Sequence, residues 1–245
     1  MSAHYDRLET RSPQSRDTAA YRALRAILGI ARHRAPALRA QLRGVELSKL
    51  ANAAALAKTP PIRKSDLIRL QKDAAPFGGL AAAKPGHLRR LLVSPGPIFE
   101  PEGAAKDWWG AARAFYAAGL RKGDIVHNSF SYHLTPGAHI MESGCAAIGA
   151  AVIPGGVGQT EQQIEAIEAL RPNFYAGTPD FLKVLLDKAR ELGRDVSSIK
   201  RALVSGAALP PSLRQELLER GVVAVEGASA AVAEDPRTRA AYLGM

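Results

Sequence analysis

Three segments rich in glycine, proline and serine carry the residue types that hold ligands through the main chain: 94–103, 154–161 and 205–210. Loops of small residues leave main-chain N–H groups accessible, and such groups bind phosphates and other anions. In 94–103, however, three prolines remove N–H donors and two glutamates repel anions. Both a phosphate loop and a rigid structural turn therefore stay open for this segment.

The segment 154–161 follows an apolar run and opens a predicted helix. Its N–H groups can hold an anion at the helix N-terminus, or the segment is a plain strand-to-helix connection. Thr160 and Gln163 match a capping box, in which each side chain satisfies a main-chain donor of the other. The segment 205–210 is small enough to let a flat ring lie against its backbone, which by itself is weak support for a site.

Histidine spacing does not indicate a metal site. His127, His133 and His139 recur every six residues, which matches neither a helical nor an alternating ligand geometry for zinc. The chain also lacks a nucleophile elbow and an HExxH motif. We therefore predict no metal ligands, assign no catalytic residue, and interpret His127 and His133 as pocket-lining or core groups.

Strands and helices alternate from about residue 90 to residue 225. Apolar runs predict strands at 91–93, 122–127, 150–154, 174–177, 202–206 and 222–225, and helical spacing predicts helices at 104–118, 139–148, 160–170, 180–192 and 211–220. Such alternation is typical of an α/β fold with a mostly parallel sheet flanked by helices. We expect ligand loops at the carboxyl ends of the strands.

The net charge of +10 comes entirely from the first 72 residues, which hold 15 Lys and Arg against 5 Asp and Glu. Apolar positions recur at helical spacing in 16–43, with arginines between them, which predicts an amphipathic helix. A phosphate- or nucleic-acid-binding protein is one alternative. Because no nucleic-acid motif accompanies the arginines, we interpret them as a solvated face and expect no nucleic-acid partner. The predicted organisation is a basic helical region, 1–72, before an α/β lobe, 73–225.

Cysteine content and hydropathy bear on the compartment. The single cysteine, Cys145, cannot form a disulfide within the chain. No apolar run approaches the roughly 20 residues that span a bilayer, and the first residues lack the layout of a signal peptide. We expect a cytoplasmic protein with no membrane partner.

Seven blocks in order along the chain resemble the phenylacetate-CoA ligase family of adenylate-forming acyl-CoA synthetases. The blocks are 5–11, 64–67, 119–126, 154–163, 170–172, 177–182 and 204–210. The resemblance implies the N-terminal lobe of such an enzyme. It also implies ATP-dependent adenylation of a carboxylate followed by thioester formation with CoA. The cofactors implied by the family are ATP, Mg²⁺ and CoA, and the implied substrate is an aromatic acid such as phenylacetate.

The resemblance also assigns roles to particular positions. Ser94 and Gly96 correspond to the family's phosphate loop. The remaining nucleotide-binding positions are Thr178, Pro179, Ser205, Gly206, Ala207 and Ala208, and the implied acyl pocket contains Tyr132, His133, Gly155 and Gly156.

The chain departs from the family pattern in its phosphate loop, which keeps only fragments of the motif, and at Ala207, where an acidic residue is usual. The match ends near Val225. The family's later Tyr-Gly-x-(Thr/Ser)-Glu motif, ribose-binding aspartate and lysine-bearing domain have no counterpart, and 226–245 reads as an aberrant tail. We therefore expect a shortened or frame-shifted chain that is inactive alone and prone to self-association. A remnant or partner-dependent nucleotide- or acyl-binding module is the alternative.

Overall fold

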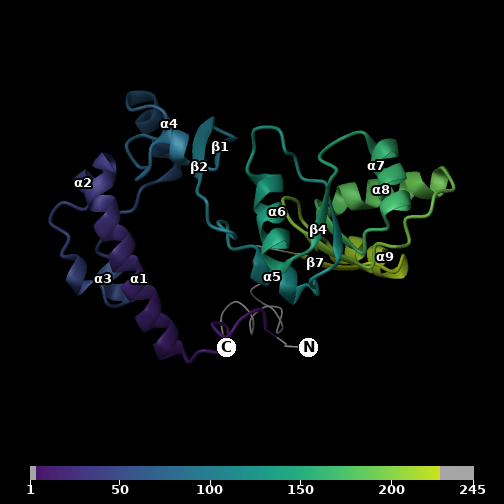
Figure 1. Cartoon of the computed structure of the whole chain (residues 1–245), viewed down its shortest axis with the longest axis horizontal. Helices are drawn as coiled ribbons and strands as arrows, with labels where there is room; N and C mark the ends of the chain where they lie inside the picture. Colours follow the sequence, from purple (N-terminus) through teal and green to yellow (C-terminus); the bar gives the residue numbers. More distant parts are fainter. Residues whose placement is uncertain (1–3, 227–245) are drawn as a thin grey trace. The chain divides into compact units, whose positions relative to one another are not determined.

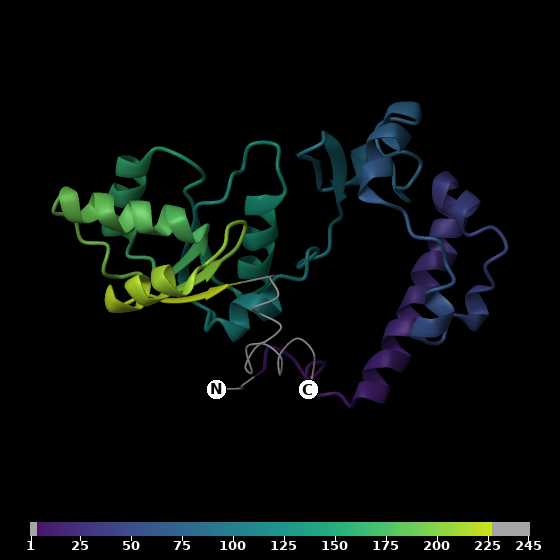
Figure 2. The same cartoon turned by 180° about the vertical axis from the view of Figure 1, so that it is seen from behind.

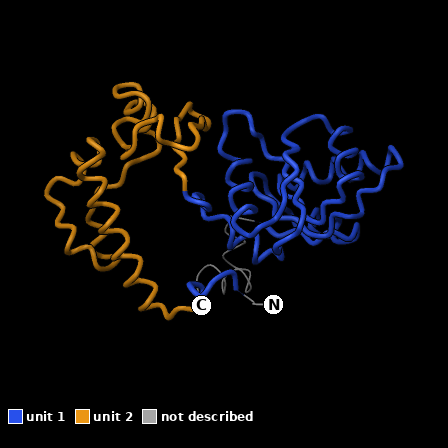
Figure 3. The backbone as a smooth tube through the Cα atoms, in the orientation of Figure 1, with its two compact units in different colours: residues 1–9, 105–245 blue, residues 10–104 orange. Residues whose placement is uncertain are grey.

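The chain divides into two compact units, residues 10–104 and residues 1–9 with 105–245 (Figure 3). The structure, a computed structural model, describes residues 4–226. The predicted organisation into 1–72, 73–225 and an aberrant tail stays a prediction, and all of that tail except Glu226 lies outside the described residues. We describe each unit by itself.

The larger unit is built on a parallel sheet of five strands within the described residues. These are β3 (Ile125–Asn128), β4 (Ala151–Pro154), β5 (Phe174–Gly177), β6 (Arg201–Val204) and β7 (Val223–Glu226). Their order across the sheet is β4-β3-β5-β6-β7, and every neighbouring pair is parallel. The predicted α/β fold with a mostly parallel sheet is confirmed.

Helices cover both faces of this sheet (Figures 1 and 2). They are α5 (Ala112–Ala117), α6 (Gly137–Ile148), α7 (Thr160–Leu170), α8 (Pro179–Glu191) and α9 (Pro211–Glu219). Successive residues of a strand face opposite sides, so Phe174 packs with α5 and α6 while Tyr175 packs with α7, α8 and α9. Phe174 and Tyr175 are almost fully buried, and each contributes roughly 1.5–3 kcal/mol of hydrophobic stabilisation.

The helix predicted over 104–118 is shorter than expected, since α5 begins at Ala112. The carboxylate of Asp107 accepts hydrogen bonds from the main-chain N–H groups of Ala111 and Ala112, each over 3.0 Å. Aspartate competes with helix formation through such local bonds and favours the position before a helix. Gly119, at φ +100°, ends the helix as predicted, and Leu120 N–H reaches back to the carbonyl of Phe115 over 2.9 Å.

The smaller unit contains helical segments and one antiparallel hairpin among its described residues. The helical segments are α1 (Pro13–Arg34), α2 (Pro36–Gln41), η1 (Leu47–Lys49), α3 (Ala53–Leu56), α4 (Lys64–Asp73) and η2 (Pro85–His87). The hairpin pairs β1 (Arg90–Ser94) with β2 (Ile98–Glu102). Sequence analysis missed β2, because its proline and glutamates read as a loop. Gln71 on α4 holds the hairpin through two hydrogen bonds of 2.8 Å to the main chain of Phe99.

The basic helical region differs from the single predicted helix in two ways. Pro36 has no N–H to donate, so the helix breaks after Arg34 and restarts as α2. Its arginines are also not purely a solvated face. Arg25 donates to the carbonyl of Leu50 over 2.8 Å, Arg32 donates to the carbonyls of Leu42 and Val45, and Arg39 donates to those of Arg32 and His33. Three guanidinium groups therefore bind main-chain carbonyls and stabilise the connections between the helical segments of this unit.

Candidate functional site

The strand order predicts a crevice at the carboxyl edge of the sheet, at the switch point between β3 and β5. The chain passes from β3 to β4 on one side, then returns to β5 on the other side of β3. The connection after β3 leads to α6 and that after β5 leads to α8, which cover opposite faces. Connections that diverge in this way leave a crevice between two strand ends, where open α/β sheets bind their ligands.

The floor of this crevice is a buried hydrogen-bonded chain at the ends of β3 and β5. Ser129 N–H donates to the carbonyl of Ala176 over 2.8 Å. The Ser129 hydroxyl donates to the phenolic oxygen of Tyr175 over 2.6 Å, and the Tyr175 hydroxyl donates to the carbonyl of Thr178 over 3.1 Å. Burial raises the pKa of Tyr175, so its hydroxyl keeps its proton and remains a donor. The strand ends are thereby held at a fixed separation.

Several predicted nucleotide-binding residues lie beside one another at this floor. Ser205 N–H donates to the carbonyl of Gly177 over 3.1 Å, which joins the loop after β6 to the end of β5. A Cβ atom on Gly206 would lie 3.6 Å from the side chain of Thr178 and 3.5 Å from that of Phe130. Gly206, Ala207 and Ala208 are exposed, and Pro179 is buried as the first residue of α8.

Thr178 has a second, local role as the N-cap of α8. Its hydroxyl accepts a hydrogen bond from Phe181 N–H over 3.4 Å. Pro179, at the first helical position, has no N–H that would need an acceptor. A hydroxyl thus stands at the helix N-terminus, directly beside the crevice.

Three of the predicted acyl-pocket residues, Tyr132, Gly155 and Gly156, gather around Asn128 and His127 at the end of β3. The Asn128 amide donates to the Tyr132 hydroxyl over 2.9 Å, and the Asn128 carbonyl accepts from Gly156 N–H over 3.1 Å. A Cβ on Gly156 would lie 3.9 Å from the Tyr132 ring. Burial and the nearby Glu142 raise the pKa of Tyr132, so its hydroxyl stays neutral.

His133 follows in the same loop and is exposed, with its N–H donated to the hydroxyl of Ser131 over 3.2 Å. Gly155 lies directly over His127: a Cβ there would be 2.8 Å from the ring. The structure therefore brings Tyr132 and Gly156 together and places Gly155 on the imidazole of His127, one residue before Asn128.

Ser94 and Gly96 belong to the other unit, at the turn of the β1–β2 hairpin. Ser94 is buried, and its hydroxyl donates to the carboxylate of Glu100 on the facing strand. Gly96 is exposed. This geometry is that of a structural turn, one of the two alternatives that the sequence left open. A role of Ser94 and Gly96 in phosphate binding stays a prediction.

Sequence reasoning missed three polar residues that organise this site. Asn128 is the last residue of β3, Ser129 follows it, and Gln163 lies on α7; all three are buried. The predicted capping box is wrong, because Gln159 precedes α7 in a left-handed conformation, φ +49°, without a side-chain cap. Gln163 instead bonds the carbonyls of Gly156 and Gly158. The signal available in the sequence was the polar pair Asn-Ser directly after an apolar run.

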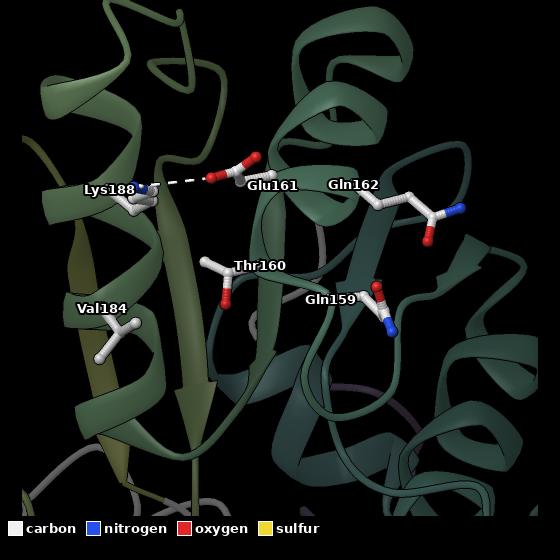
Figure 4. A pocket seen from close by; sticks show the side chains of 6 residues that line it. All are labelled: Gln159, Thr160, Glu161, Gln162, Val184 and Lys188. Atoms are coloured by element: carbon white, nitrogen blue, oxygen red, sulfur yellow. Dashed lines mark ion pairs between the residues drawn. The ribbon is translucent and has the colours of Figure 1, made fainter.

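An open pocket of about 410 Å³ lies elsewhere, between the first turn of α7 and α8 (Figure 4). Its lining residues are Gln159, Thr160, Glu161, Gln162, Val184 and Lys188. The ammonium of Lys188 lies 3.6 Å from the carboxylate of Glu161 and 3.0 Å from that of Glu191. Hydrogen bonding to Glu191 raises the pKa of Lys188, so the pocket's cation is already neutralised within the chain.

Within residues 4–226, no group of three or more His, Cys, Asp or Glu side chains is placed to hold a metal ion. The magnesium that the resemblance implies stays a prediction, and we assign no step to a metal. No helix in this part of the chain is long and apolar enough to cross a membrane.

Comparison with known proteins gives relatives of one kind. The phenylacetate-coenzyme A ligase of Pseudomonas putida is 33% identical over 174 residues, which cover 67% of this chain and 38% of the relative. That of Aromatoleum evansii is 32% identical over 160 residues, covering 62% of this chain and 35% of the relative. The matched part of this chain thus spans less than half the length of these relatives. No family model matches the chain.

Among solved structures, 2-hydroxyisobutyryl-CoA ligase in an open conformation, in complex with 2-HIB-AMP and CoA, superposes with a TM-score of 0.84 at 23% identity. The superposition covers 97% of this chain and 55% of that protein, and it shows a shared fold. Over its matched residues, the chain is therefore related to the N-terminal part of the phenylacetate-CoA ligases, the family that its motifs resemble.

Proposed function

We propose that this chain forms the N-terminal portion of an AMP-forming acyl-CoA synthetase of the phenylacetate-CoA ligase type. In the proposed reaction, the carboxylate of an aromatic acid attacks the α-phosphate of ATP, which releases pyrophosphate and gives an acyl-adenylate. The thiol of CoA then displaces AMP and forms a thioester. ATP and CoA are the proposed co-substrates, Mg²⁺ is the proposed metal, and the proposed location is the cytoplasm.

The observation that carries this proposal is the meeting of loops at the switch point between β3 and β5. Residues from the family-like blocks 154–163, 177–182 and 204–210 converge there with the loop that follows β3. Two of these loops are bonded to strand ends: Ser205 N–H donates to the carbonyl of Gly177, the last residue of β5, and Gly156 N–H donates to that of Asn128, the last residue of β3. Blocks far apart in the sequence thus supply one crevice, which is the arrangement that joining a nucleotide to an acid requires.

The two sides of the crevice suit different parts of the reaction. Around Thr178 and Gly206 the residues are small, so a flat purine ring can approach the backbone and the Thr178 hydroxyl can donate to a phosphate or ribose oxygen. Around Tyr132 the ring and its neighbouring glycine segment offer an apolar wall, against which an aromatic acid can stack. The Tyr132 hydroxyl stays neutral and so imposes no charge on the carboxylate.

Titration calorimetry of the full chain with ATP and with phenylacetate tests this proposal. We expect saturable binding of both ligands. Ala208→Trp should weaken ATP binding by at least tenfold while phenylacetate binding is kept, because the exposed Ala208 lies at the proposed adenine side. Ala169→Trp, at an exposed position late in α7, is the matched control and should change neither affinity. Absence of binding of either ligand to the unmodified chain would overturn the proposal.

A pyrophosphate-release assay with ATP, Mg²⁺, phenylacetate and CoA tests the chemistry separately from binding. The sequence-based expectation of an inactive chain predicts binding without pyrophosphate release. Release at a rate that depends on phenylacetate would show that the chain completes adenylation alone, and that expectation would then be wrong.

A further inference from the structure

The glycine-rich segment 155–158 is held from beneath by two buried side chains. Gln163, on the first turns of α7, is 4% exposed. Its amide nitrogen donates to the carbonyl of Gly156 over 3.0 Å and to that of Gly158 over 2.6 Å. Both amide protons are thereby used, and the amide oxygen must face away from the segment.

The oxygen of this amide lies 2.7 Å from Nε2 of His127 on β3. Since an amide oxygen only accepts, His127 carries its proton on Nε2, and Nδ1 has no hydrogen-bond partner among the described residues. The ring is fully buried and stacks on Tyr175, with centroids 6.3 Å apart and planes 21° from parallel. The tautomer of His127 and the orientation of the Gln163 amide therefore determine each other.

This pair also determines how the segment presents its main chain. In a trans peptide the C=O and the following N–H point in opposite directions. Because the carbonyls of Gly156 and Gly158 point at Gln163, the N–H groups of Val157 and Gln159 point the other way. A reversed Gln163 amide would set its oxygen against two carbonyls, and the segment would have to rearrange.

Gly155 completes the arrangement through a close approach. A Cβ at this position would lie 2.8 Å from Cε1 and Nε2 of His127 and 2.9 Å from the amide oxygen of Gln163. No real Cβ tolerates such contacts, so the main chain rests directly on the two hydrogen-bonded side chains. The segment is thus held both by hydrogen bonds and by contact.

We propose that His127 and Gln163 are positioning residues that hold segment 155–158 in the conformation in which it lines the acyl pocket. The inference rests on the proposed function, which places Gly155 and Gly156 in that pocket. Neither side chain touches the substrate. Their action is to keep the wall facing Tyr132 in place, so their loss should weaken acid binding and leave nucleotide binding unchanged.

The first test compares Gln163→Leu with Gln215→Leu in the full chain. Leucine has nearly the shape of glutamine but cannot donate, whereas Gln215 is exposed on α9 and serves as the matched control. We expect Q163L to weaken phenylacetate binding about tenfold by calorimetry, as for the loss of ordinary hydrogen bonds, with ATP affinity unchanged. Hydrogen exchange in 154–160 should become faster in Q163L only.

The second test is rescue at His127. His127→Gln keeps a donor where Nε2 lies, and His127→Phe keeps a ring without a donor. We expect H127Q to retain phenylacetate affinity within about threefold and H127F to match Q163L. In the unmodified chain, nitrogen NMR of labelled histidine should show one ring protonated on Nε2 and insensitive to solvent exchange. If H127F does not fold, the Q163L comparison and the NMR signature still decide the matter.

The outcomes separate this inference from the function on which it rests. Unchanged phenylacetate affinity in Q163L, in a chain that binds the acid, would overturn the positioning role alone. If the unmodified chain does not bind phenylacetate, the proposed function fails, and hydrogen exchange alone then tests the role of His127 and Gln163. In that case faster exchange confined to 154–160 in Q163L supports the hold on the segment, and unchanged exchange overturns it.

Discussion

The hydroxyl of Ser129 lies 2.6 Å from the phenolic oxygen of Tyr175, and the main chain of Gly177 passes directly over this hydrogen bond. A Cβ on Gly177 would be 2.1 Å from the Ser129 hydroxyl and 2.2 Å from the Tyr175 hydroxyl. The bond that ties β3 to β5 therefore depends on the absence of a side chain at residue 177. Ser129, directly after β3, thus forms one unit of structure with Tyr175 and Gly177 of β5.

Gly177→Ala should consequently destabilise the larger unit by about 2 kcal/mol or more, because the new methyl group must break the bond or displace a strand end. Urea unfolding followed by tryptophan fluorescence measures this, since Trp108 and Trp109 both belong to that unit. Gly137→Ala is the control: its Cβ would meet only ordinary contacts of 3.5 Å or more, and the change should stay within about 0.5 kcal/mol. Equal effects of the two substitutions would contradict the argument.

Stability should fall in mild acid because of His127. Burial lowers the pKa of this imidazole in the folded chain, whereas the unfolded chain takes up a proton near pH 6.5. The contribution of His127 to the free energy of unfolding is therefore fully present above about pH 6.5. It decreases as the pH falls below that value, by about 2 kcal/mol at most at pH 5. Denaturant unfolding at several pH values measures the slope. H127Q should flatten it between pH 5 and 6.5, and a slope unaffected by that substitution would exclude His127 as its source.

The thiol of Cys145 should be unreactive in the folded chain. The residue is fully buried on α6, and burial together with the nearby Glu142 raises the pKa of the thiol to about 12. Thiolate is the reactive form, so alkylation requires local or global opening. Because the chain has a single cysteine, the labelling rate with iodoacetamide reports this opening directly. Rapid labelling of the native chain, at the rate of the urea-unfolded chain, would show that α6 is not closed over Cys145.

Arg32 should matter more for stability than a neighbouring exposed arginine. Its guanidinium donates to the carbonyls of Leu42 and Val45, and Arg32→Met should cost about 1–3 kcal/mol because these partly buried carbonyls lose a charged donor. Arg22→Met, at an exposed position of the same helix, should be nearly neutral. Far-ultraviolet circular dichroism during urea unfolding compares them.

The same arginines bear on the alternative of nucleic-acid binding. Since Arg25, Arg32 and Arg39 are bonded to main-chain carbonyls, we expect only weak retention on nucleic acid, with a shallow dependence on salt. A steep loss of binding between low and moderate salt would favour that alternative instead.

Local patterns predicted the fold well where one interaction dominates. The strand 174–177 was placed correctly, because a short apolar run bounded by turn residues is typical of a buried strand. Thr178 and Pro179 likewise marked the start of α8. Local patterns were misleading where tertiary contacts determine the partners of a side chain. Gln163 satisfies the capping-box spacing, yet its amide is used by His127 and two glycine carbonyls, which no local rule reveals.

The candidate site was predicted in its parts but not in its arrangement. Small residues after each strand indicated loops such as 205–210, which follows β6 in the structure; that this loop binds a ligand stays a prediction. Strand order depends on long-range packing, so the sequence did not reveal that β3 lies between β4 and β5. The crevice and its floor of Ser129 and Tyr175 follow from that order.

The close fit of Gly155 over His127 and Gln163 has a consequence for how such chains diverge. A side chain at residue 155 can be accommodated only if the His127 ring or the Gln163 amide changes as well, because both would lie within 3 Å of the new Cβ. The three positions should therefore show strong epistasis, with double substitutions less harmful than the sum of the single ones. Related chains that keep Gly155 should therefore also keep His127 and Gln163, and a substitution at one of the three should be accompanied by substitutions at the others.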